Sequence, residues 1–100
     1  MASVTFTNRA IDDMDTIGEY HAHYSPNYAS QLQDAIIARV KALKEFPEMG
    51  RLVPEFNRAY LRELIYKLYR IVYRLVSDTQ IDILPIRHSS RDLAERFFDI

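Results

Sequence analysis

The stretch of sequence that decides the fold is residues 60–86, YLRELIYKLYRIVYRLVSDTQIDILPI. Within residues 69–75, tyrosine, isoleucine and leucine alternate with arginine and valine, and this period of two is typical of a β-strand with one buried face. Residues 60–66 and 81–86 have the composition of two further strands, and the serine and aspartate at 77–78 favour a turn. We therefore expect three consecutive strands that pair as an antiparallel meander.

Two amphipathic helices are predicted before the meander, because apolar residues recur there at helical spacing. The apolar positions are Ile11, Met14, Ile17 and Tyr24 in the first helix, and Tyr28, Leu32, Ile36, Val40 and Leu43 in the second. Asn8 is suited to cap the first helix, and Ser25 before Pro26 is a start signal for the second. A strand at residues 3–8, SVTFTN, precedes both helices.

The remaining segments complete an α+β fold. Residues 47–58 contain two prolines and a glycine, which predict irregular structure, and residues 90–98 predict a short amphipathic helix. The expected order is strand, antiparallel helix pair, three-stranded antiparallel meander and short C-terminal helix. One layer of helices on one antiparallel sheet buries both sets of apolar positions. Residues 1–100 suit a single domain.

Composition limits the chemistry. The chain has 100 residues, no cysteine and a formal net charge of −1, so disulfide bonds and thiolate chemistry are excluded. No apolar run long enough to span a membrane and no signal peptide is recognised, so we expect a cytoplasmic protein without membrane association. His21 and His23 diverge on a helix, and no group of ligand residues has a suitable spacing. We therefore expect neither a metal nor a cofactor.

Charge is distributed unevenly along the chain. Residues 39–75 have a net charge of +5, whereas residues 1–38 have −4 and residues 76–100 have −2. The basic middle third is a candidate surface for an anionic partner. Ordinary scatter of surface charges is the alternative interpretation.

The order of elements, together with four short motifs, resembles the RelE/ParE toxin superfamily. The motifs are FPEMGRLVPE at 46–55, LREL at 61–64, YRIVY at 69–73 and IRHSSRD at 86–92. The resemblance implies the toxin of a bacterial type II toxin–antitoxin (plasmid stabilisation) module, held inactive in a hetero-oligomer with its cognate antitoxin. We expect an acidic, partly disordered antitoxin to cover the basic region 39–75. RelE-like members cleave mRNA on the ribosome, and ParE-like members poison DNA gyrase.

For an mRNA interferase, the resemblance implies that Glu55, Arg70 and His88 are catalytic. Glu55 matches a general base, Arg70 matches the arginine at the scissile phosphate, and His88 matches a proton-exchanging histidine. The alternative for Arg70 is a cross-strand ion pair with an acid such as Glu63 or Asp82. The alternative for His88 is a sheet-end histidine without a catalytic task.

Further arginines are candidates for binding nucleic acid or the target protein, because guanidinium groups suit phosphate and carboxylate oxygens. They are Arg51, Arg62, Arg74, Arg87 and Arg91. Arg51 can equally tie down the loop that contains it. Tyr69 and Tyr73 could stack bases, but their alternation around Ile71 favours positions in the core.

Two departures from the nuclease pattern favour the ParE-like branch. RNases of one branch follow the histidine with tyrosine, where this chain has Ser89. RelE-like enzymes use a tyrosine in the terminal helix, and residues 89–100 contain none. A chain with a negative net charge is also poorly suited to RNA. We therefore favour inhibition of DNA gyrase, with ribosome-dependent mRNA cleavage as the alternative and a domain that only forms complexes as the third possibility.

Overall fold

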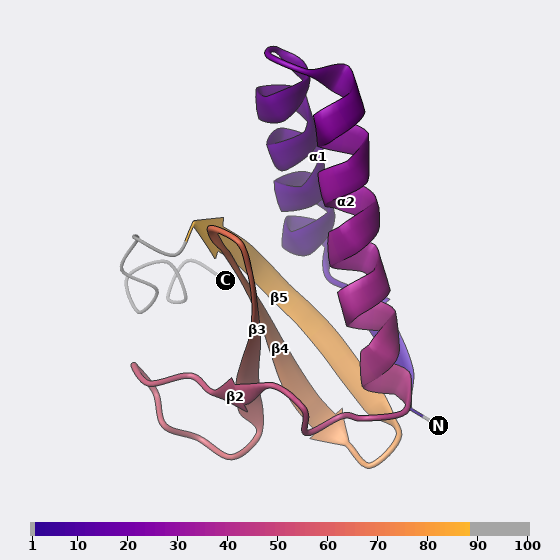
Figure 1. The fold of residues 1–100 in the computed structure, drawn as a ribbon. Coiled ribbons are helices and arrows are strands. Elements are labelled where there is room, and N and C mark those ends of the chain that lie inside the picture. Colours follow the sequence, from indigo (N-terminus) through magenta and orange to yellow (C-terminus); the bar gives the residue numbers. More distant parts are fainter. Residues whose placement is uncertain (1, 89–100) are drawn as a thin grey trace.

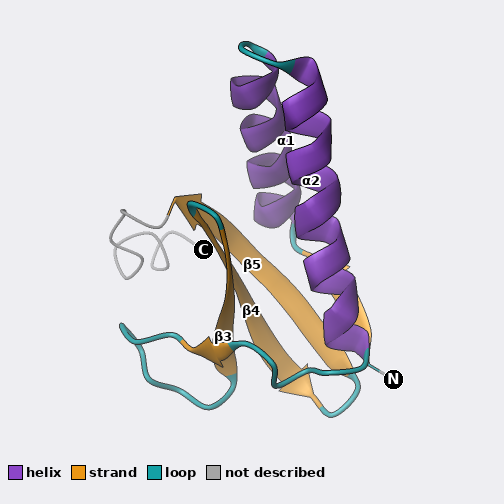
Figure 2. Ribbon diagram, in the orientation of Figure 1, coloured by secondary structure: helices purple, strands orange, loops and turns teal. Residues whose placement is uncertain are grey.

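The computed structural model describes residues 2–88 and consists of a helical hairpin packed on one face of a twisted sheet (Figure 1). The elements follow in the order β1 (Ser3–Phe6), α1 (Asn8–Ala22), α2 (Pro26–Lys41), the 3-10 turn η1 (Ala42–Lys44), β2 (Arg51–Leu52), β3 (Leu61–Tyr66), β4 (Tyr69–Ser77) and β5 (Gln80–His88). The long loop between η1 and β3 lies at the end of the sheet remote from the hairpin tip (Figure 2). The α+β class and the helix pair followed by a strand meander are confirmed.

The sheet has five strands in the order β1-β5-β4-β3-β2. Strands β3, β4 and β5 form the predicted antiparallel meander, but β1 pairs with β5 in parallel, with Val4 opposite Ile81. The expectation of a purely antiparallel sheet was therefore wrong, because a connection through helices lets the first and last strands run in the same direction. A two-residue edge strand, β2, lies within the segment 47–58 that was predicted to be irregular.

Both helices begin at side-chain caps. The hydroxyl of Thr7, not the predicted Asn8, accepts the bond from the backbone N–H of Ala10 at 3.2 Å. Thr7 also donates to the carbonyl of Ile83 at 2.7 Å, which fixes the start of α1 against β5. The predicted start of α2 is confirmed, since the Ser25 hydroxyl accepts from the N–H of Tyr28 at 3.2 Å.

The main core lies between the hairpin and the sheet. Its buried side chains include Met14, Ile17, Leu32, Ile36, Val40, Leu43, Leu64, Ile71, Tyr73, Ile81, Ile83 and Ile86. The core position predicted for Tyr73 is confirmed, and Tyr69 packs partly buried against the same cluster. Ile11 and Tyr24, which were predicted on the apolar side of the first helix, are exposed. Tyr24 follows α1 at the hairpin tip, which extends past the strand ends (Figure 1).

A second, smaller core covers the opposite face of the sheet. Val53 and Phe56 from the long loop pack on Leu61, Val72 and Leu84. Side chains alternate across a strand, so Val72 faces away from the helices while its neighbours in β4 face toward them. The loop therefore covers part of the face that the helices leave open.

Pro85 lies inside β5, where a proline would interrupt regular pairing. Three steps of β5, from Ile83 to Ile86, lie opposite only two steps of β4, from Ile71 to Tyr73. This irregularity is a β-bulge, the position within a sheet where proline is tolerated.

The C-terminal helix predicted at 90–98 and the candidate Arg91 lie outside the described residues. Within residues 2–88, none of the helices has the length and apolar composition that crossing a membrane requires.

Candidate functional site

Arg70 lies in β4 on the face of the sheet away from the helices, in register with Arg87 on β5. Its guanidinium binds two carboxylates. The terminal nitrogens donate to both oxygens of Glu55 at 2.7 and 2.8 Å, and Nε donates to Glu63 at 2.8 Å. The predicted alternative of an ion pair with Glu63 is confirmed, and Glu55 is a second partner.

The two carboxylates around Arg70 differ in accessibility. The Glu63 side chain is fully buried at 0% exposed, that of Arg70 is 8% exposed, and that of Glu55 is 26% exposed. Glu63 also accepts a bond from Nε of Arg51 at 2.5 Å. Two arginines and two glutamates thus form one cluster without net charge, and it joins the long loop and β2 to β3 and β4.

The ion pairs shift the acid–base equilibria of the cluster. Hydrogen bonding to Arg70 lowers the pKa of Glu55 against the opposing effect of partial burial. The same bonds, with Glu55 first and Glu63 next, raise the pKa of Arg70. Both groups are therefore held in their charged forms at neutral pH.

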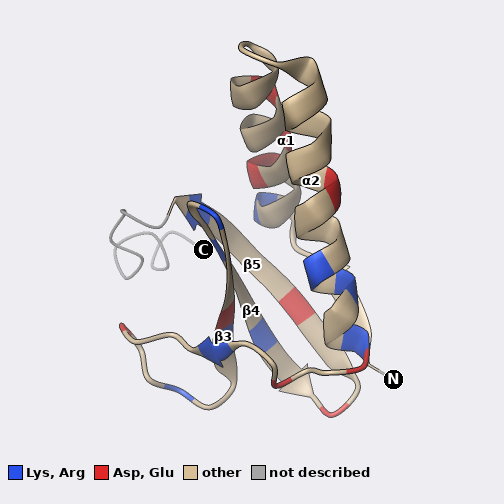
Figure 3. Cartoon of the chain, viewed as in Figure 1, with Lys and Arg blue, Asp and Glu red and all other residues tan. Residues whose placement is uncertain are grey.

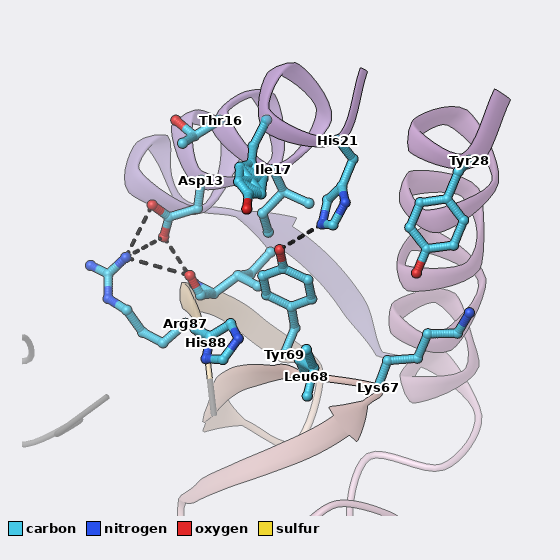
Figure 4. A pocket seen from close by; sticks show the side chains of 12 residues that line it. Asp13, Thr16, Ile17, His21, Tyr28, Lys67, Leu68, Tyr69, Arg87 and His88 are labelled. Atoms are coloured by element: carbon cyan, nitrogen blue, oxygen red, sulfur yellow. Dashed lines mark hydrogen bonds and ion pairs between the residues drawn. The ribbon is translucent and has the colours of Figure 1, made fainter. Parts of the chain in front are cut away.

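His88 lies on the other face of the sheet. His88 is in β5 and lies opposite Tyr69 of β4, and the centroids of the two rings are 5.9 Å apart. The structure therefore brings Glu55 and Arg70 together but leaves His88 on the helix-facing side (Figure 4). Of the three residues predicted to be catalytic, two form a pair and the third is separated from them by the sheet.

The other candidate arginines make structural contacts. Arg62 donates to the backbone carbonyl of Gly50 at 3.0 Å and so holds the long loop. Arg74 is partly exposed and pairs with Asp82 at 3.5 Å. Arg51 ties down its loop through Glu63, in line with the alternative considered for it.

Arg87 is bound by a carboxylate of α1. Its Nη1 lies 3.1 Å from Asp13, and the same carboxylate accepts the backbone N–H of Ile86 at 2.9 Å. Asp13 thus provides a hydrogen-bond acceptor for the N–H of Ile86, which lies at the edge of β5 beyond the end of β1 and has no neighbouring strand on that side. This contact could not be predicted from the sequence, because no local pattern reports a contact between residues 13 and 87.

Acidic residues therefore interrupt the basic middle third in space. Lysine and arginine positions alternate with aspartate and glutamate positions over β3, β4 and β5 (Figure 3). Arg51, Arg70, Arg74 and Arg87 are each paired with a carboxylate, whereas within residues 2–88 the cations at the C-terminal end of α2 and in η1 form no ion pair with a carboxylate (Figure 3).

Tyr73 anchors the long loop from within the core. Its hydroxyl donates to the carbonyl of Pro47 at 2.8 Å and accepts the backbone N–H of Gly50 at 3.0 Å. Gly50 is required by this close approach, because a Cβ there would lie 2.6 Å from the Tyr73 oxygen and 2.7 Å from the carbonyl oxygen of Glu63. Burial raises the pKa of Tyr73, so it stays a neutral hydrogen-bonding group.

A cavity of about 600 Å³ opens on the helix-facing side, in the angle between the hairpin and the ends of β3, β4 and β5 (Figure 4). Its lining includes Asp13, Ile17, Tyr20, His21, Tyr28, Lys67, Leu68, Tyr69, Ile86, Arg87 and His88. His21 Nε2 lies 2.9 Å from the Tyr69 hydroxyl, and burial raises the pKa of Tyr69. This cavity could not be predicted from the sequence, because its walls come from the hairpin, the β3–β4 turn and the end of β5, which are far apart in the chain.

Lys67 lies at the rim of this cavity, in the turn between β3 and β4. It adopts a left-handed backbone conformation with φ of 53°, which is uncommon for a residue other than glycine or asparagine. Its ammonium group lies 5.1 Å from the ring centroid of Tyr28 and 5.7 Å from that of Tyr66. Among residues 2–88, Lys67 forms no ion pair with a carboxylate.

A helical hairpin packed on one face of a small mixed sheet defines the class of protein as a compact α+β domain, the class that the resemblance to the RelE/ParE superfamily implied. Residues 4–93 match the family described as "ParE toxin of type II toxin-antitoxin system, parDE". The chain is 34% identical over 91 residues to "Toxin RelE2" of Caulobacter vibrioides, covering 91% of this chain and 99% of that protein. The solved structure titled "Chromosomal ParDE TA system from P. aeruginosa" superposes with a TM-score of 0.73 at 25% identity, covering 88% and 96% of the two chains. The chain therefore belongs to the ParE toxin family of type II toxin–antitoxin systems, and the resemblance seen in its sequence is confirmed.

Proposed function

We propose that this toxin acts by binding and inhibiting DNA gyrase and does not cut mRNA. The observation that carries the proposal is the placement of the three residues implied for cleavage. Arg70 is held by Glu55 and Glu63, and His88 lies on the opposite face of the sheet. A nuclease needs its base, its cation and its acid around one phosphate, each within hydrogen-bond reach.

The electrostatics of the Arg70 cluster also argue against phosphate binding. The guanidinium of Arg70 is already occupied by two carboxylates, and the cluster that they form with Arg51 has no net charge, so an approaching phosphate finds no unpaired cation there. Glu55 is also a weak base, because Arg70 lowers its pKa and a general base works best with a pKa near the operating pH.

We further propose that a cognate antitoxin neutralises this toxin in a hetero-oligomer in the cytoplasm. Family membership supports this partnership, as does the similar structure whose title names a ParDE toxin–antitoxin system. The long loop and strand β2 lie at one edge of the sheet, and an extended antitoxin segment could add a strand there. Arg51 and Arg74 pair with Glu63 and Asp82, but their side chains remain 62% and 49% exposed, so an acidic segment can still reach them.

Two assays on one toxin preparation test the proposal. Purified toxin is added to DNA gyrase with relaxed plasmid, and separately to ribosomes translating a labelled message. We expect supercoiling to be inhibited and the message to stay intact, and the antitoxin should reverse the inhibition. Unimpaired gyrase together with a cleaved message would refute the proposal.

Ribosome-dependent cleavage is the alternative function, and the contact between Glu55 and Arg70 favours it, since both belong to the motif implied for nucleases. Cleavage would require Glu55 to leave Arg70 and a proton donor to come from elsewhere than His88. If message is cut, loss of cutting in Arg70→Ala and its retention in His88→Ala would define that site.

A further inference from the structure

Three of the exposed aromatic side chains within residues 2–88, those of Tyr20, Tyr24 and Tyr28, lie near the tip of the helical hairpin, whereas Phe46 and Tyr60 lie in the segment between η1 and β3. Tyr20 is 56% exposed and Tyr24 is 76% exposed, and their ring centroids lie 5.8 Å apart. Leu68, at the facing turn between β3 and β4, is 60% exposed. Exposed tyrosines beside an apolar side chain are typical of the centre of a protein–protein interface.

The cavity between these two exposed elements is large enough for an anchoring side chain. Its volume of about 600 Å³ lies within the range of ligand-binding cavities. Rings of His21, Tyr28 and Tyr69 form part of its wall, and the bond between His21 and Tyr69 fixes two of them in place. The cavity is thus a preformed apolar site with a few polar groups.

The charge around the cavity selects an acidic partner. Lys67 forms no ion pair with a carboxylate within residues 2–88, whereas Arg87 at the opposite wall is matched by Asp13. The lining therefore has two cations and one carboxylate, a net charge of +1 with neutral histidines. The Arg70 cluster on the other face, by contrast, is already neutralised by the chain's own glutamates.

We propose that this cavity, with Tyr20, Lys67 and Leu68 at its rim and Tyr24 beside Tyr20, is the surface through which the toxin docks on its target protein. The bound segment of gyrase has an apolar anchor side chain flanked by carboxylates, the anchor entering the cavity and a carboxylate meeting Lys67. The hairpin tip and the β3–β4 turn both lie at the edge of the molecule, so a large partner can reach them (Figure 1). This inference rests on the proposed function.

The test measures binding of the purified toxin to gyrase holoenzyme and, separately, to its antitoxin. Tyr20→Ala and Leu68→Ser remove exposed side chains, and we expect each to weaken gyrase binding about tenfold. Lys67→Asn removes the charge but suits the left-handed backbone, and should weaken binding about threefold, while Lys67→Arg should retain it. Val76→Ser is the matched control, because Val76 is an exposed apolar residue near the opposite end of β4, and its binding should be unchanged.

Each outcome has a distinct meaning. If the wild-type toxin does not bind gyrase, the proposed function is wrong and this inference falls with it. If the wild type binds and the rim variants bind equally well, the docking surface is wrong while the proposed function stands. If the rim variants lose antitoxin and keep gyrase, the surface belongs to the antitoxin and the proposal is overturned. Melting temperatures equal to that of the wild type show that the variants are folded.

Discussion

The two faces of the sheet satisfy their polar groups in different ways. On the face away from the helices, Arg70 and Glu63 are buried and bonded to each other and to neighbouring charges. On the helix-facing side, the cavity at the hairpin tip is open, and Lys67 at its rim has only aromatic rings as neighbours for its charge within residues 2–88. The ion pairs on the first face stabilise the fold. On the second face, the open cavity and the charge of Lys67 can still form contacts with a partner protein.

Because the two faces differ in this way, different residues should determine the stability of the fold and the binding of a partner. A buried charge whose partner is removed is left unsolvated, whereas an exposed side chain that is removed returns to water at little cost. Substitutions in the Arg70 cluster should therefore change the free energy of unfolding, and substitutions at the cavity rim should change binding.

The largest effect is expected for Glu63→Ala. Glu63 is fully buried between two arginines, so its loss leaves the guanidinium of Arg70 with one carboxylate and that of Arg51 with none. The free energy of unfolding should fall by about 3 kcal/mol, as measured by urea denaturation. Glu63→Gln keeps the volume and should lose less. A loss as small as that of a surface substitution would contradict a role for this face in stability.

Gly50→Ala should be the next most damaging change. The new methyl group would overlap the Tyr73 hydroxyl and a backbone oxygen of β3, and backbone cannot move aside without disturbing the strand pair. We expect a loss of about 2 kcal/mol. Gly18→Ala is the matched control, because the atoms that its methyl group meets belong to the flexible side chain of Gln33. Equal melting temperatures for the two variants would contradict this account of the loop.

Tyr73→Phe removes one oxygen from the core while keeping the ring. The carbonyl of Pro47 and the N–H of Gly50 then lose their partner. The cost should be about 1.5 kcal/mol, measured by denaturation at neutral pH. Faster amide hydrogen exchange confined to the long loop would accompany it. Wild-type stability would show that these two backbone groups are satisfied in another way.

Acidic pH should lower the free energy of unfolding by weakening the ion pair between Glu55 and Arg70 on the face of the sheet away from the helices. Arg70 holds the pKa of Glu55 below its ordinary value of 4.5, so its stabilising contribution is fully present above that pH. The contribution is lost as the pH falls through 4.5 and then through the lower pKa of the folded state. Glu55→Gln should decline less steeply over this range in thermal melts from pH 6 to pH 3. Parallel curves for the two proteins would contradict the ion pair.

The smallest effect on stability is expected for Leu68→Ser. Leu68 is exposed in a turn, so the free energy of unfolding should change by less than about 0.5 kcal/mol. A larger loss would show that Leu68 packs against other side chains of the toxin, and this result would contradict its placement as an exposed residue at the cavity rim.

Most of the fold could be predicted from local patterns, because helical and strand periods are properties of neighbouring residues. Ser25 and Pro26 marked the start of α2, and the alternation around Ile71 marked β4. The parallel pairing of β1 with β5 could not be predicted, since it depends on the direction in which the chain enters the sheet again after the helical hairpin. The cap at Thr7 was missed by one residue, because threonine and asparagine both suit that position.

The candidate site was predictable only in part, because its contacts join distant residues. Arg70 was singled out, and one of its alternative partners, Glu63, lies across the strand pair as expected. The pair with Glu55 spans fifteen residues and depends on the path of an irregular loop. That His88 lies on the opposite face follows from its register with Tyr69, and the sequence does not determine this register.

One measurement tests the contrast between the two faces most directly: the toxin concentration that halves supercoiling by gyrase, for Leu68→Ser and Ile65→Ser. Both residues are exposed and apolar, but Ile65 lies in register with Arg70, while Leu68 lies at the cavity rim. The account predicts that Leu68→Ser raises this concentration about tenfold and that Ile65→Ser leaves it unchanged. An inhibitor weakened by Ile65→Ser and indifferent to Leu68→Ser would contradict it.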